Sequence, residues 1–227
     1  MIFAIGASFF YLSDSYSPNQ EAISSLISSE ELLVEEKENY TAFIPQEKAG
    51  SQALIFYQGG KVEEEAYAKL LRKIATAGIP SYIVKMPFNL AVFDIDAANQ
   101  VIEKEKENEE WFLAGHSLGG AMAASYASDH SEKLKGLILL ASYSSVDLRD
   151  KNLSLLSIYG TEDKILDQEK YLENKKFLPH LTEVEIEGGN HAYFGSYGEQ
   201  EGDGEAEIPS SEQISKTAKE IIDFIQK

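Results

Sequence analysis

The stretch Trp111-Phe112-Leu113-Ala114-Gly115-His116-Ser117-Leu118-Gly119-Gly120 determines how we expect this chain to fold. Its first half is apolar and predicts a buried strand that ends at Gly115. A run of mostly small residues over 121–127 predicts a helix that begins just after Ser117. The turn between them is so tight that only glycines can flank the serine, which is the strand–turn–helix context of a nucleophile elbow. The serine hydroxyl would then lie at a helix N-terminus, where unpaired N–H groups and the helix dipole favour negative charge.

The composition restricts the class of protein to which the chain can belong. Its 227 residues suit one large domain, and 43% hydrophobic residues provide material for a sizeable core. The 20 Lys and Arg residues against 38 Asp and Glu give a net charge of −18, which repels phosphate backbones and anionic lipids. We therefore expect no nucleic-acid partner. The chain has no cysteine, which excludes disulfides, Cys-based zinc sites and a thiol nucleophile.

The first 20 residues are expected to form an apolar segment and linker, followed by a single domain over residues 21–227. Residues 1–12 are largely apolar but too short to span a bilayer, and no Lys or Arg precedes Lys37, so a secretory signal is not evident. The segment is interpreted either as a docked N-terminal element or as the end of a longer membrane anchor. A cytoplasmic location is the default expectation. Membrane contact, or a membrane-anchored or extracellular location, is expected only with such an anchor.

The rest of the chain predicts strands and helices in alternation. Residues 32–36 and 40–44 are expected to pair as antiparallel strands. Later strands are predicted at 53–57, 82–84, 111–115, 137–141, 153–159 and 182–186. Helices are predicted at 21–29, with Ile23, Leu26 and Ile27 on one face, at 63–77, 94–107 and 167–177, and after a capping-box pattern at 210–213. This order predicts an α/β fold with a mostly parallel sheet and helices on both faces.

Three side chains with complementary chemistry are expected at the carboxyl edge of this sheet, where parallel α/β folds place their catalytic groups. Asp163 follows the strand that ends at Tyr159, and His191 follows the strand that ends near Ile186. With Ser117 they give the chain order Ser, Asp, His, which elbow-bearing hydrolases use. A histidine can take the serine proton and return it to the leaving group, while a carboxylate fixes the imidazole tautomer.

Two other carboxylates are alternatives to Asp163 as the partner of the imidazole. Glu162 is its neighbour in the chain, and Asp147 follows the preceding strand. His116 lies inside the elbow itself, where we expect it to shape the turn rather than to move protons.

Stabilising a developing oxyanion requires hydrogen-bond donors that are in place before the reaction begins. We expect the backbone N–H of Leu118 to be one of them. The second is expected in the loop Gln58-Gly59-Gly60-Lys61, because its two glycines let backbone N–H groups approach a substrate closely. The N–H of Gly60 and that of Lys61 are both candidates, and a simple tight turn is compatible with the same residues.

From about Leu54 to the C-terminus, the chain resembles the α/β-hydrolase superfamily. The stretches that carry the resemblance are Tyr57-Gln58-Gly59-Gly60-Lys61-Val62, Lys85-Met86-Pro87-Phe88-Asn89-Leu90, Gly115-His116-Ser117-Leu118-Gly119-Gly120 and Gly188-Gly189-Asn190-His191-Ala192-Tyr193-Phe194-Gly195. They are similar to a compact, lidless branch, the alpha/beta hydrolase fold-5 type, near the dienelactone hydrolases and carboxylesterases. The resemblance implies hydrolysis of an ester or related acyl compound without a cofactor or a metal. Dienelactone hydrolases use a cysteine at the elbow, so Ser117 argues against their substrate.

The resemblance also implies an open site. Many larger relatives insert a cap between the strands that here end at Ala141 and begin at Leu153, and this interval is short. We therefore expect no cap domain, and small or accessible acyl groups as substrates. Candidate pocket residues are Phe88, Asn89, Tyr143 and Tyr193. The acidic, glycine-rich loop over 195–204 is expected to be solvated and mobile.

These observations predict a serine hydrolase that cleaves carboxylic esters through an acyl-enzyme intermediate, with a small-molecule acyl substrate as its partner. A thioesterase, a small-amide hydrolase or a non-catalytic ligand-binding protein on the same fold are the alternatives, since a fold alone does not establish chemistry.

Overall fold

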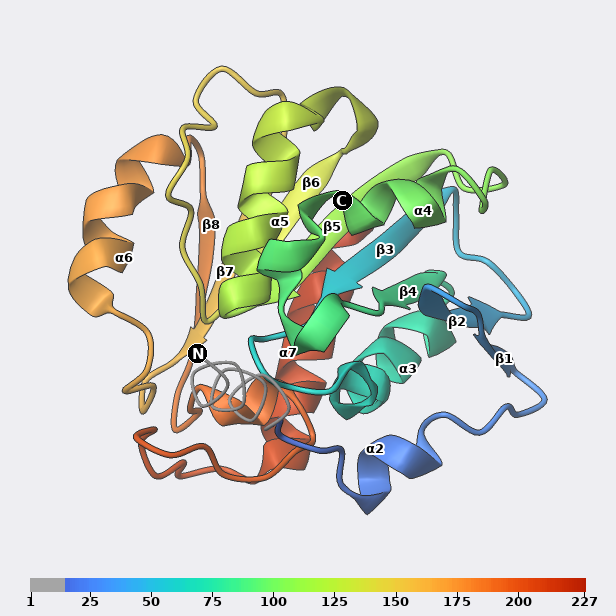
Figure 1. Cartoon of the computed structure of the whole chain (residues 1–227), viewed down its shortest axis with the longest axis horizontal. Coiled ribbons are helices and arrows are strands. Elements are labelled where there is room, and N and C mark those ends of the chain that lie inside the picture. Colours follow the sequence, from blue (N-terminus) through green and yellow to red (C-terminus); the bar gives the residue numbers. More distant parts are fainter. Residues whose placement is uncertain (1–14) are drawn as a thin grey trace, which may run out of the picture.

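The computed structural model describes residues 15–227, so the apolar segment predicted at 1–12 lies outside the described residues. Within the described residues, the central sheet has eight strands in the order β1-β2-β4-β3-β5-β6-β7-β8 (Figure 1). The strands are β1 Leu32–Glu36, β2 Tyr40–Pro45, β3 Gln52–Tyr57, β4 Ser81–Val84, β5 Glu110–His116, β6 Gly136–Leu140, β7 Ser154–Gly160 and β8 Thr182–Ile186. β2 runs antiparallel to β1 and β4, and all other neighbours are parallel. The predicted mostly parallel sheet is confirmed.

Helices cover both faces of this sheet, as predicted. They are α2 Gln20–Ser24, α3 Ala68–Thr76, α4 Ala98–Ile102, α5 Leu118–Asp129, α6 Gln168–Asn174 and α7 Ser210–Ile225. In Figure 1, α5 lies in front of the sheet and α7 lies behind it. α3 and α7 enclose one apolar core with Leu54 and Phe56 of β3, and α4 and α5 enclose the other with Ala53, Ile55 and Tyr57. Successive side chains of β3 point to opposite faces of the sheet. They are apolar on both faces, because each face is covered by a layer of helices.

The helix predicted over 94–107 is shorter in the structure. A 3-10 turn at Ile95–Ala97 leads into α4, which ends at Ile102. Beyond it, the Tyr40 hydroxyl donates to Glu105 at 2.6 Å, and the Asn108 side chain donates to the Tyr82 hydroxyl at 2.9 Å. These tertiary contacts hold residues 103–108 against β2 and β4, and they override the high helix propensity of the charged stretch.

Three other helices also differ from the predictions. α2 ends at Ser24, and it buries Ala22, whereas Ile23 is 43% and Ile27 66% exposed. The 63–77 helix is divided into a 3-10 turn and α3. The predicted capping box at 210–213 does not form, because the extended Pro209 is the N-cap residue and no side chain caps the helix.

The loops at the carboxyl edge complete the fold. Residues 141–153 contain neither helix nor strand, and no separate cap domain covers this edge among residues 15–227. The 195–204 loop is not solvated throughout, because Ser196 and Tyr197 are buried and the Ser196 N–H donates to the Ala66 carbonyl.

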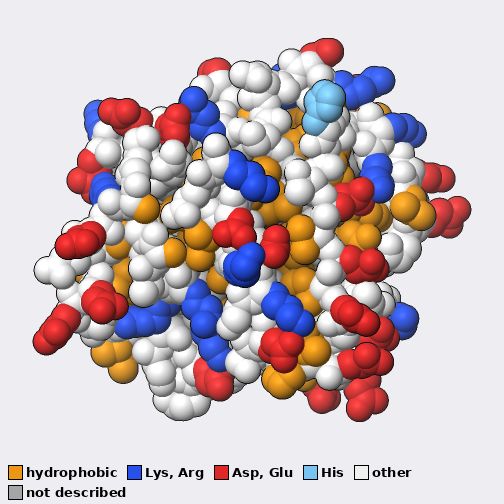
Figure 2. All heavy atoms as spheres, turned by 180° about the vertical axis from the view of Figure 1, so that it is seen from behind, with side chains coloured by type: hydrophobic (Ala, Val, Ile, Leu, Met, Phe, Trp, Pro, Cys, Tyr) orange, Lys and Arg blue, Asp and Glu red, His pale blue; other side chains and the backbone are white. Residues whose placement is uncertain are grey.

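None of the helices in the described part of the chain is long and apolar enough to cross a membrane. Figure 2 shows acidic and basic side chains interspersed with apolar ones over the back of the molecule.

Candidate active site

Ser117 occupies the turn between β5 and α5 in a conformation that few non-glycine residues adopt. Its φ is 53° and its ψ is −121°. A Cβ at Gly115 would lie within 2.5 Å of the Gly119 backbone, and a Cβ at Gly119 would overlap the Gln58 carbonyl oxygen. The two glycines of Gly-x-Ser-x-Gly are thus required by the close approach of β5, α5 and the loop after β3.

Asp163 and His191 come together at the carboxyl ends of β7 and β8. The Nδ1 of His191 lies 2.9 Å from the Oδ2 of Asp163, and both side chains are almost completely buried. The other carboxylate oxygen accepts the N–H groups of Ile165 and Leu166, each at 2.8 Å. Because Nδ1 donates to the carboxylate, the neutral ring has its lone pair at Nε2. This buried Nε2 has no hydrogen-bond partner within residues 15–227.

The alternative carboxylates have other partners. Asp147 is held by the exposed Arg149, whose hydrogen bonds lower the pKa of that carboxyl to about 2. Glu162 accepts a hydrogen bond from the Thr161 hydroxyl. The structure therefore brings Asp163, and neither alternative, to the His191 ring.

A cavity of about 300 Å³ opens at the elbow, and Ser117 and His191 both line it. Its other lining residues are Leu118, Ala121, Ala141, Ser142, Tyr143, Ser145, Ile165, Leu166 and Asp167. This set contains one carboxylate and no Lys or Arg. The cavity is therefore suited to an uncharged ligand of modest size.

Of the four predicted pocket residues, Tyr143 lines this cavity and the other three do not. Phe88 is 54% exposed, with its ring 5.8 Å from that of Phe93. Tyr193 borders a separate polar hollow, and the side-chain oxygen of Asn89 accepts from Gln58 at 3.1 Å. The residues that sequence reasoning missed follow strand ends: Ser142 and Ser145 follow β6, and Ile165 and Leu166 follow Asp163. Position beyond the carboxyl end of a strand was the signal that would have indicated them.

Two backbone N–H groups remain as candidate oxyanion donors. The N–H of Leu118 is at the start of α5, where no helical acceptor exists for it. The N–H of Lys61 donates to the Asn89 carbonyl at 2.8 Å, so it is already occupied. The N–H of Gly60 has no acceptor within residues 15–227, and a Cβ at Gly60 would lie 3.1 Å from the Leu118 side chain. The candidate from this loop is therefore Gly60.

His116, which lies inside the elbow, has a hydrogen-bond partner at each of its ring nitrogens. Its ring is buried, with Nδ1 2.7 Å from the Tyr67 hydroxyl and Nε2 3.0 Å from the His191 carbonyl oxygen. Burial, and then the neighbouring His191, lower the pKa of His116 well below its usual value, so it is neutral. Within the described residues, no group of three or more His, Asp or Glu residues is placed to hold a metal ion.

Solved structures with the same fold include several hydrolases. A predicted CIB-like hydrolase from Thermoplasma acidophilum superposes with a TM-score of 0.62 at 13% identity, over 85% of this chain and 99% of that one. An esterase from Pyrobaculum calidifontis gives 0.64 at 18% identity, over 90% and 91% of the chains. A carboxyl esterase from Tuber melanosporum gives 0.64 at 11% identity, over 93% and 91%.

The family comparison covers most of the chain. The sequence model of the alpha/beta hydrolase family matches residues 53–215, from β3 into α7, and so includes the elbow, Asp163 and His191. The chain therefore belongs to the alpha/beta hydrolase family.

Proposed function

We propose that this protein is a serine hydrolase that cleaves carboxylic esters of small or accessible acyl groups. The observation that carries the proposal is the state of His191. Asp163 holds its Nδ1, while its Nε2 is buried without a partner beside a cavity that Ser117 also lines. A buried ring nitrogen without a hydrogen-bond partner destabilises the folded protein, and such groups are found mainly where they have a function. In this cavity, that function is to accept a proton.

In the first step, the Ser117 oxygen attacks the ester carbonyl carbon and its proton moves to the Nε2 of His191. Asp163 stabilises the imidazolium that forms. The carbonyl oxygen becomes an oxyanion, which the N–H groups of Leu118 and Gly60 are placed to hold. When the C–O bond to the alcohol breaks, the alkoxide takes the proton from Nε2, and an acyl group remains on Ser117.

In the second step, a water molecule repeats the sequence. It attacks the acyl carbon and transfers a proton to the Nε2 of His191, and collapse of the tetrahedral intermediate releases the carboxylic acid and restores the Ser117 hydroxyl. The open carboxyl edge of the sheet gives water access to the acyl group.

The cavity favours short, uncharged acyl groups. Its volume is at the low end for small-molecule sites, and its walls carry no cation that would pair with a carboxylate substrate. Two of the solved structures with this fold, from Pyrobaculum calidifontis and Tuber melanosporum, are described as esterases, which supports an ester as the substrate.

The test is hydrolysis of a series of p-nitrophenyl esters with acyl chains of increasing length, by the native protein and by Ser117→Ala. We expect turnover to be greatest for short chains and to fall by about 10⁴-fold or more in the variant. Saturable ester binding without turnover by the native protein would indicate a ligand-binding protein and would overturn the proposal.

A further inference from the structure

A chain of three hydrogen bonds joins the loop after β3 to the loop that carries His191, and it passes through the elbow. The Gly59 N–H donates to the Tyr67 hydroxyl oxygen at 3.0 Å. That hydroxyl lies 2.7 Å from the Nδ1 of His116, and the Nε2 of His116 lies 3.0 Å from the His191 carbonyl oxygen. The side chains of Tyr67 and His116 are almost completely buried, so no bulk solvent competes for these bonds.

The groups at the two ends determine which atom donates in each of these hydrogen bonds. A carbonyl oxygen can only accept, so the Nε2 of His116 must carry the ring proton. The Nδ1 of a neutral ring is then an acceptor, and the Tyr67 hydroxyl donates to it. The Tyr67 oxygen in turn accepts from the Gly59 N–H. Every donor and acceptor along the path is satisfied in one arrangement only, and burial keeps the Tyr67 hydroxyl protonated by raising its pKa.

The residues joined by these three hydrogen bonds are next to, or belong to, the groups of the proposed reaction. Gly59 precedes Gly60, His116 precedes Ser117, and the last acceptor belongs to the backbone of His191 itself. A Cβ at Gly59 would lie 2.7 Å from both the Nδ1 of His116 and the Tyr67 hydroxyl oxygen, so the loop can approach these groups only as glycine. The rings of His116 and His191 also pack with their centroids 4.7 Å apart.

We propose that Tyr67 and His116 are positioning residues, which fix the loop after β3 and the His191 backbone at a set distance from Ser117. This role rests on the proposed function. Neither side chain lines the cavity, so neither is expected to touch the substrate. Both would act by holding the Gly60 N–H and the His191 ring where the transition state needs them, because small displacements of such groups reduce rates severely.

The first test compares Tyr67→Phe with Tyr82→Phe. Tyr82 is a fully buried tyrosine on β4 whose hydroxyl accepts from the Asn108 side chain at 2.9 Å, so its variant also leaves a buried N–H unpaired, in the segment before β5. We expect Tyr67→Phe to lower kcat by about 10- to 100-fold with KM nearly unchanged. Tyr82→Phe should keep the native kcat although it also lowers thermal stability, because the hydrogen bond that it removes lies outside the site. Equal kcat values in the two variants would overturn the positioning role.

The second test replaces His116 by two residues of different hydrogen-bonding capacity. His116→Gln keeps a donor that can reach the His191 carbonyl and should retain kcat within about fivefold of the native value. His116→Leu keeps bulk but no donor, and kcat should fall as far as in Tyr67→Phe. Equal kcat values for the Gln and Leu variants would overturn the role of this hydrogen bond.

A third readout does not depend on activity. Imidazole ¹⁵N chemical shifts at pH 7.5 should show His116 protonated at Nε2 in the native protein. Protonation at Nδ1 would overturn the proposed series of hydrogen bonds whatever the protein catalyses. Conversely, a native protein with this tautomer that hydrolyses no ester and reacts with no fluorophosphonate would overturn the proposed function, and the three hydrogen bonds would remain as a structural feature. The two failures are therefore distinguishable.

Discussion

At the residue scale, the two histidines of the site differ in what their nitrogens bind. His191 is paired at Nδ1 and unpaired at Nε2, whereas His116 is paired at both nitrogens. His191 therefore has a free lone pair that can accept a proton, and His116 has none. Sequence position predicts different roles for the two histidines, because His191 follows a strand end and His116 lies inside the elbow. The partners of His116 were not predictable, since Tyr67 and the His191 carbonyl reach it only through tertiary folding.

The buried His116 makes stability depend on pH. Its pKa is depressed in the folded state and close to 6.5 in the unfolded chain, so only the unfolded chain gains this proton as the pH falls below about 6.5. Its contribution is complete above that pH and is lost as the pH falls toward the depressed value. Urea unfolding should show that the native protein loses about 1 kcal/mol more than His116→Gln between pH 7.5 and 5.5. Equal losses would contradict a neutral, buried His116.

At the element scale, apolar runs predicted the strands well, because strands covered on both faces must be apolar throughout. The helix ends were predicted poorly, because contacts such as Tyr40 with Glu105 determine where residues 94–107 leave the helix. The choice of Gly60 over Lys61 as the proposed oxyanion donor depends on a similar contact. The Asn89 carbonyl, from a distant segment, occupies the Lys61 N–H, and no sequence pattern signals that bond.

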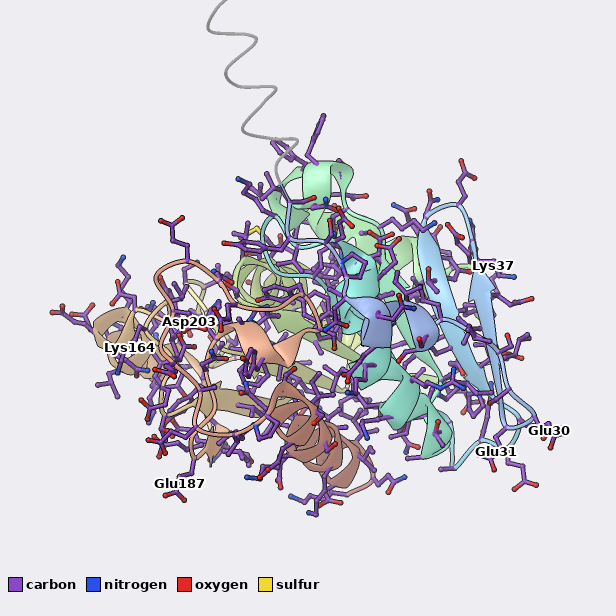
Figure 3. All side chains as sticks on the ribbon, turned by 90° about the horizontal axis from the view of Figure 1, so that it is seen from below. Glu30, Glu31, Lys37, Lys164, Glu187 and Asp203 are labelled. Atoms are coloured by element: carbon purple, nitrogen blue, oxygen red, sulfur yellow. The ribbon has the colours of Figure 1, made fainter. Side chains whose placement is uncertain are left out.

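The loops after β7 and β8 are joined by one carboxylate that the sequence did not single out. Asp203 accepts the Ala192 N–H at 2.8 Å and the Lys164 N–H at 3.3 Å, and Figure 3 shows Lys164 and Asp203 on neighbouring loops. We expect Asp203→Asn to lower the free energy of unfolding by about 2 kcal/mol, because an amide nitrogen would face a backbone N–H. The exposed Asp223→Asn is the control and should change it by less than about 0.5 kcal/mol. Equal effects in urea unfolding would show that Asp203 does not brace these loops.

At the scale of the whole molecule, strand–helix alternation predicted the mostly parallel sheet, and the motif stretches predicted the family. The sheet order and the family match confirm both. Charge is the other global property. The chain carries −18, and the cavity wall contains Asp167 without a Lys or Arg. The carboxylate in the cavity wall and the net negative charge of the rest of the molecule therefore both repel an anionic substrate.

This charge predicts discrimination between substrates of similar size. At low salt, kcat/KM for an ester with a free carboxylate, such as a p-nitrophenyl hemisuccinate, should be at least about tenfold below that for the neutral butyrate. The difference should narrow at 1 M salt, because screening weakens the long-range part of the repulsion. A preference for the anionic ester would require a cation at the site that the cavity lining does not contain.

In the proposed mechanism, Ser117 is the nucleophile that His191 activates. The most direct test of this role is mass spectrometry of the protein after reaction with a fluorophosphonate, followed by peptide mapping of the adduct. We expect one covalent adduct, on Ser117, which does not form in Ser117→Ala and forms much more slowly in His191→Ala. An adduct on another residue, or unchanged labelling of either variant, would contradict it.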